Sequence, residues 1–136
     1  GPIVLVAEDA RVGFPEIRLA CFPPGAAALL PLRIGEARAA DWILSGGTRS
    51  GREAAEAGFA ARAVASGSLG AEVERLAARI LEISPRALSA VLPLLRRARH
   101  EALRNGLPAA EDAYRTLGGS EDLARAVREF EAARRP

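Results

Sequence analysis

Residues 12–24 read Val-Gly-Phe-Pro-Glu-Ile-Arg-Leu-Ala-Cys-Phe-Pro-Pro, an almost wholly apolar stretch that carries one carboxylate, Glu16. Proline fixes its own φ and restricts the residue before it, so Pro15 predicts a rigid backbone around Glu16. A carboxylate held rigidly in apolar surroundings is the kind of group whose pKa rises toward the range that acid/base chemistry needs. The alternative is an ordinary loop glutamate that points to water, and local composition alone favours this alternative.

The composition of the 136-residue chain excludes several classes of site. Cys21 is the only cysteine, so we expect no internal disulfide, no metal cluster built on thiolates, and a reducing cytoplasm as the compartment. All 19 basic residues are arginine, which rules out a lysine Schiff base or a P-loop lysine. With a net charge of +2 and 4% aromatic residues, the chain lacks the basic, aromatic surface typical of nucleic-acid binding.

Membrane and metal sites are not expected either. Hydrophobic residues make up 49% of the chain, but the apolar runs are short beside the roughly 20 residues of a membrane-spanning helix. The apolar start, residues 3–6, has the length of a strand and no basic region before it, so no signal peptide is expected. Gly1-Pro2 looks like the remnant of a cleaved expression tag, which suggests that the natural chain continues upstream. The single histidine, His100, is expected at the surface.

Hydrophobic periodicity and capping signals predict a mostly helical chain with two or three short strands. The strands are expected at 3–8, in a piece that ends at Pro15, and within 59–65. Ser50 and Glu53 match a capping box, and Gly106 is expected to end a helix. The predicted helices cover about 26–34, 36–44, 51–58, 69–83, 85–105, 108–117 and 120–134. Two or three short strands cannot form a stable sheet alone. We therefore expect further strands upstream or in a partner chain.

Four segments, in this order and spacing, resemble the C-terminal half of the crotonase (enoyl-CoA hydratase/isomerase) family. "EDARVGFPEIRLACFP" resembles the family's strand, Pro-Glu and Leu-Gly-x-x-Pro signature, and "RIGEARAADWILSGGTRSGREAAEAGFAARAV" resembles its Gly-x-x-x-Ala helix and Ala-x-Glu-Ala-x-x-x-Gly-Leu-Val segment. "AARILEISPRAL" and the closing "SEDLARAVREFEAARRP" complete the match. The resemblance implies an α/β crotonase-like fold, represented here mainly by its α-helical C-terminal half. It also implies that residues 3–66 belong to the core and 67–136 to a helical oligomerisation region.

The resemblance implies a chemical role for Glu16. In hydratases of the family, the glutamate after this proline is the general acid/base that handles the proton exchanged between a catalytic water and the α-carbon of an acyl-CoA thioester. The substrate is then an enoyl- or dienoyl-CoA, and no cofactor is needed besides the CoA of the substrate. The family's oxyanion hole and its second catalytic glutamate lie upstream of the matched half, and Glu8, expected at an exposed strand end, does not replace that glutamate.

Further residues are implied in substrate binding or depart from the family pattern. Phe22 could line the acyl pocket or simply pack, as could Trp42, and Phe130 could lie near CoA or anchor the last helix. Pro24 stands where many hydratases have glycine, and it has no N–H to offer a catalytic water. The Phe-Pro-Pro variant looks more like the cyclohexa-1,5-diene-1-carbonyl-CoA hydratases than the fatty-acid enzymes.

The resemblance also implies a homo-oligomer, a trimer or a dimer of trimers, built by the helices from Leu69 onward. Two other functions stay open at this point. The chain as it stands could be a non-catalytic helical oligomerisation fragment, or it could belong to an enoyl-CoA isomerase of the same fold.

Overall fold

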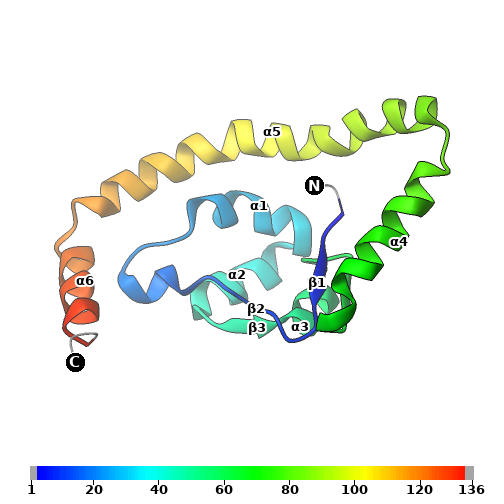
Figure 1. Cartoon of the computed structure of the whole chain (residues 1–136). Coiled ribbons are helices and arrows are strands. Elements are labelled where there is room, and N and C mark those ends of the chain that lie inside the picture. Colours follow the sequence, from blue (N-terminus) through cyan, green and yellow to red (C-terminus); the bar gives the residue numbers. More distant parts are fainter. Residues whose placement is uncertain (1–2, 134–136) are drawn as a thin grey trace. The chain divides into compact units, whose positions relative to one another are not determined.

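The computed structural model describes residues 3–133 (Figure 1). Helices dominate and the strands are short, as predicted. In chain order the elements are β1 (Leu5–Ala7), β2 (Arg11–Gly13), η1 (Pro15–Leu19), α1 (Pro24–Ile34), α2 (Glu36–Ser45), β3 (Thr48–Ser50), α3 (Gly51–Glu56), β4 (Arg62–Val64), η2 (Ser66–Ser68), α4 (Leu69–Leu81), α5 (Pro85–Gly118) and α6 (Glu121–Ala133). The two η elements are short 3₁₀ helices.

The chain divides into two compact units, each built from two segments that are distant in sequence. The first joins the described residues of 1–12 to 49–101, and the second joins 13–48 to the described residues of 102–136. The predicted division at residues 66 and 67 concerns an oligomer, which a single chain does not test, so it stays a prediction. Gly1 and Pro2, interpreted above as a tag remnant, lie outside the described residues.

The first unit is organised around a small parallel sheet. β1 pairs with β4 so that Leu5 lies opposite Arg62 and Ala7 opposite Val64, and α3 packs against both strands. Helix α3 comes close because its contacting residues are small: Ala54 is fully buried, and a Cβ added to Gly51 would lie 1.8 Å from the carbonyl oxygen of Ala7. The backbone of β1 therefore occupies the space that a side chain at position 51 would need.

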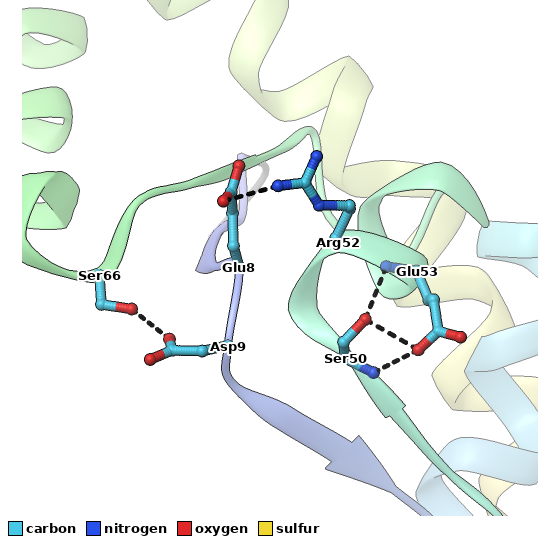
Figure 2. Close-up of polar contacts among 6 residues, drawn as sticks. All are labelled: Glu8, Asp9, Ser50, Arg52, Glu53 and Ser66. Atoms are coloured by element: carbon cyan, nitrogen blue, oxygen red, sulfur yellow. Dashed lines mark hydrogen bonds and ion pairs between the residues drawn. The ribbon is translucent and has the colours of Figure 1, made fainter.

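The predicted capping box starts α3 (Figure 2). The Ser50 N–H and hydroxyl donate to Oε2 of Glu53, at 2.7 and 2.8 Å, and the Glu53 N–H donates back to the Ser50 hydroxyl at 3.2 Å. The backbone N–H of Ser50, followed by its hydroxyl, stabilises the charged carboxylate and so lowers the pKa of Glu53. These bonds satisfy donors that the first turn of a helix otherwise leaves unpaired.

Two further side-chain contacts join the end of β1 to the rest of this unit (Figure 2). Glu8 accepts from the guanidinium of Arg52 at 2.8 Å, and the Arg52 N–H donates to the Glu8 carbonyl at 3.3 Å. The Ser66 hydroxyl donates to Asp9. Glu8 directly follows β1, as expected of a strand-end residue, and its side chain is 39% exposed and paired with Arg52.

The second unit holds the largest buried side chain of the described residues, Trp42. It lies on α2, which packs against α1, and its ring meets Phe14 edge-on, with centroids 5.6 Å apart. Only Gly35 separates the two helices, and its φ of +84° allows the abrupt reversal. Trp42 is therefore a core residue, so packing, rather than an acyl pocket, accounts for it.

The expected helix end at Gly106 is wrong, because α5 continues through Gly106 and Pro108 to Gly118. Glycine costs a helix interior about 1 kcal/mol and proline about 3 kcal/mol relative to alanine, which is why the sequence indicated a break. The tertiary contact explains the glycine: a Cβ at position 106 would lie 3.3 Å from the Cβ of Ala28 on α1. Gly106 thus lets α5 approach α1 closely, and packing rather than capping determines its place.

Gly51→Ala should lower the free energy of unfolding by about 3 kcal/mol, because the added methyl group pushes against the backbone of β1. Urea denaturation of the chain followed by circular dichroism measures the change. Gly67→Ala is the matched control, since a Cβ there meets no atom within 4 Å, and it should change the free energy by at most about 1 kcal/mol. Equal effects of the two substitutions would contradict the close approach of α3 to β1.

Ala20→Gly should raise the free energy of unfolding by about 1 kcal/mol. Ala20 follows η1 with a φ of +55°, where an L-residue is strained by about 1–2 kcal/mol. That relief exceeds the about 0.4–1 kcal/mol by which glycine's freedom stabilises the unfolded chain. Ala27→Gly inside α1, measured in the same way, should have the opposite sign and cost about 1 kcal/mol. A loss of stability in both variants would refute the strain at Ala20.

Candidate functional site

Glu16 lies in the short helix η1, directly after Pro15 at the start of that helix. Proline is favoured there because its fixed φ suits a helical turn and its missing N–H would have no partner in the first turn. The preceding residue, Phe14, is extended at φ −128° and packs on Trp42. The rigid backbone predicted around Glu16 is therefore built from Pro15 on one side and an aromatic anchor before it.

The carboxylate of Glu16 is partly buried. Its Oε2 atom is shielded from solvent and has no hydrogen-bond partner among the described residues. Buried polar atoms in proteins are nearly always hydrogen-bonded, and a buried polar atom left without a hydrogen bond costs about 1–3 kcal/mol. A carboxylate oxygen without a donor is chemically open, since it can accept a proton or a water hydrogen without first breaking an internal bond.

In contrast, the backbone carbonyl of Glu16 has several donors. The Ala20 N–H donates to it as the cap of η1, the Cys21 N–H donates at 3.2 Å, and the Cys21 thiol donates at a sulfur–oxygen distance of 3.2 Å. Cys21 is 7% exposed, in line with the buried thiol that its apolar neighbours suggest. Burial is the main cause that raises the pKa of this thiol, and the charge of Glu16 is the second. The thiol therefore stays protonated at neutral pH.

The segment after Cys21 leads into α1. Pro23 is buried just before the helix and Pro24 is its first residue, so the helix begins two residues earlier than predicted. Phe22 is half-buried, and its ring meets Tyr114 of α5 edge-on, with centroids 5.9 Å apart and planes at 76°. Tyr114 was missed by sequence reasoning, because no local pattern relates two aromatic residues that lie 92 positions apart.

Helix α6 packs against η1, the element that carries Glu16. Phe130 lies on α6 and is 44% exposed. The structure thus brings α6 to the Glu16 segment, while the roles of Phe22, Pro24 and Phe130 in binding stay predictions. The last three residues of the closing motif, 134–136, lie outside the described residues.

Other candidate groups do not form a site within the described part of the chain. Over residues 3–133, no three His, Cys, Asp or Glu side chains come together as metal ligands would, and no helix is both long and apolar enough to cross a membrane. His100 is exposed on α5. The neighbouring arginines, Arg96, Arg97 and Arg99, are exposed too, and Arg97 pairs with Glu101 at 2.7 Å, as on an ordinary solvated helix face.

The sequence profile of the enoyl-CoA hydratase/isomerase family matches residues 2–136 of this chain. The 2,3-dehydroadipyl-CoA hydratase of Escherichia coli (strain K12) is 30% identical over 135 residues, which cover 98% of this chain and 53% of that protein. The cyclohexa-1,5-dienecarbonyl-CoA hydratase of Thauera aromatica is 47% identical over 53 residues, or 39% of this chain and 20% of that protein.

The solved structures agree. An enoyl-CoA hydratase/isomerase from Pseudoalteromonas atlantica T6c superposes with a TM-score of 0.85 at 26% identity, over 98% of this chain and 54% of that one. The chain thus spans about half the length of the relatives it matches. The helices and short strands described above are the corresponding part of the crotonase fold, and the chain belongs to the enoyl-CoA hydratase/isomerase family.

Proposed function

We propose that this chain is the C-terminal half of a hydratase that adds water to an enoyl- or dienoyl-CoA thioester, with Glu16 as its acid/base. One observation carries the proposal: in a chain of this family, the glutamate after Pro15 holds a buried carboxylate oxygen that has no partner among the described residues. The hydratase names of the Escherichia coli and Thauera aromatica relatives support addition of water. No cofactor besides the CoA of the substrate is part of the proposal.

The proposed chemistry follows from what hydration requires. A proton must reach the α-carbon of the conjugated thioester while the water oxygen bonds to the β-carbon, and the developing charge on the thioester oxygen needs hydrogen-bond donors. Glu16 supplies the proton exchange, and its open oxygen is free to hold the water or the proton in transit. The oxyanion donors and a second glutamate are assigned to the other half of the whole protein, by the family resemblance.

Glu16→Gln in the full-length protein should lower kcat for hydration of crotonyl-CoA by about 10²–10⁴, because the amide keeps the size of the side chain but cannot exchange the proton. Loss of the conjugated thioester's ultraviolet absorbance measures the rate, and chromatography of the product separates hydration from double-bond isomerisation. Glu74→Gln, an exposed carboxylate on α4, is the matched control and should keep wild-type activity. Undiminished turnover by the Glu16 variant would reject the acid/base role.

We further propose a dienoyl-CoA as the preferred substrate, of the cyclohexa-1,5-diene-1-carbonyl-CoA type. The Thauera aromatica hydratase supports this choice, together with the Phe-Pro-Pro run at residues 22–24. Pro24 opens α1 without an N–H, so the first turn of that helix offers one donor fewer to a bound water than a glycine would. The catalytic water must then be held by other groups.

Pro24→Gly should shift substrate preference toward crotonyl-CoA by about tenfold in the ratio of kcat/KM values, which is the scale of one hydrogen bond of about 1.4 kcal/mol. The two thioesters are assayed in parallel with the wild-type and variant full-length proteins. Wild-type protein should favour the cyclic dienoyl thioester. A wild-type preference for crotonyl-CoA, or an unchanged ratio in the variant, would count against the role given to Pro24.

Oligomerisation and location complete the proposal. The first unit exposes large apolar side chains on α4, on α5 and between these helices, each more than 40% exposed: Val73, Leu81, Ile83, Val91, Leu94 and Leu95. Large apolar side chains exposed in this number favour association, and a homotrimer or a dimer of trimers is the assembly we propose. A cytoplasmic location is proposed from the single cysteine.

A further inference from the structure

We infer that Cys21 is a positioning residue for Glu16. Its thiol donates a hydrogen bond to the Glu16 carbonyl and so fixes the backbone from which the Glu16 side chain extends. This inference rests on the proposed function, in which Glu16 exchanges the proton. No nucleophilic or redox role is assigned to Cys21, because its thiol is buried and protonated. Its part in the reaction is geometric.

The first argument is the convergence of donors on one atom. The carbonyl oxygen of Glu16 receives the Ala20 N–H, the Cys21 N–H and the Cys21 thiol, whereas a carbonyl has two lone pairs to offer. Pro15 fixes the chain on the other side of the same residue. With both flanking peptides held, the backbone of Glu16 cannot rotate without breaking several hydrogen bonds at once.

The second argument concerns the quality of the thiol as a donor. A thiol is normally a weak donor, but its hydrogen bond gains strength where water cannot compete. Cys21 is 7% exposed and its sulfur lies 3.2 Å from the oxygen. Burial and the nearby Glu16 charge favour the protonated thiol, so the donor is present throughout the neutral pH range.

The third argument is that the Glu16 side chain needs backbone support. Its buried Oε2 has no hydrogen-bond partner among the described residues, so no bond at that oxygen helps to aim the carboxylate. Catalytic groups must be held within about 0.5 Å of a productive position, and supporting contacts usually provide that precision. Here the support comes through the main chain, from the turn that Ala20 and Cys21 form.

The test compares Cys21→Ala with Cys21→Ser in the full-length hydratase. Alanine removes the donor, and kcat should fall about fivefold to tenfold with KM changed less than about twofold, the scale of one lost hydrogen bond. Serine restores a donor, and kcat should return to within about twofold of wild type. Should the alanine variant not fold, Cys21→Val fills the volume without a donor and takes its place. Ile43→Val, in the same core, is the control for general loss of packing and should keep wild-type kcat.

Amide hydrogen exchange on the full-length protein provides a readout that needs no activity. The amides of Ala20 and Cys21 should lose protection in the alanine variant and recover it in the serine variant, while the amide of Gly46, bonded to the Ile43 carbonyl, stays unchanged. Unchanged protection at Ala20 and Cys21 would overturn the inference, as would an active hydratase whose alanine variant keeps wild-type kcat. An inactive wild-type protein would overturn the proposed function instead, and exchange would still decide whether the thiol holds the Glu16 carbonyl.

Discussion

The turn closed at Ala20 is the constraint on which the Glu16 segment depends. A left-handed residue must follow η1 so that the chain can reverse and direct the N–H groups of Ala20 and Cys21 at the Glu16 carbonyl. Alanine occupies this position although glycine would adopt it without strain. Strained backbone conformations persist where surrounding contacts hold them, and they gather near functional groups. The buried thiol of Cys21 is one of the contacts that hold this turn.

How much of the fold could be predicted depended on whether the signal was local. The capping box of Ser50 and Glu53 is satisfied by neighbours three residues apart, and it was predicted. Gly106 gave an equally clear local signal for a helix end, and that signal misled. The structure places Gly106 against Ala28 on α1, a close approach between segments 78 positions apart that the local pattern does not contain.

The candidate site shows the same division. Pro15, Glu16 and the apolar run after them are adjacent in sequence, so a restrained backbone at Glu16 could be predicted from the residues alone, although composition alone favoured a side chain that points to water. The contact of Phe22 with Tyr114 and the packing of α6 on η1 come from the far end of the chain, and periodicity could not place them. The hydrogen bond from the Cys21 thiol to the Glu16 carbonyl was missed for another reason. It follows a turn with a positive φ at Ala20, and alanine rarely adopts a positive φ, so nothing in the sequence indicated that turn.

Glu16 differs from three other glutamates whose carboxylates are bound by donors within the fold. Glu8 is paired with Arg52, Glu53 with two donors of Ser50, and Glu72 with Arg62 and Arg75. Each of these carboxylates contributes to local structure and is satisfied by doing so. Glu16 has a buried oxygen without such a bond among the described residues, although leaving it so costs about 1–3 kcal/mol. An open, buried carboxylate oxygen is what the proposed acid/base role requires, and departures from local consistency are expected at functional sites.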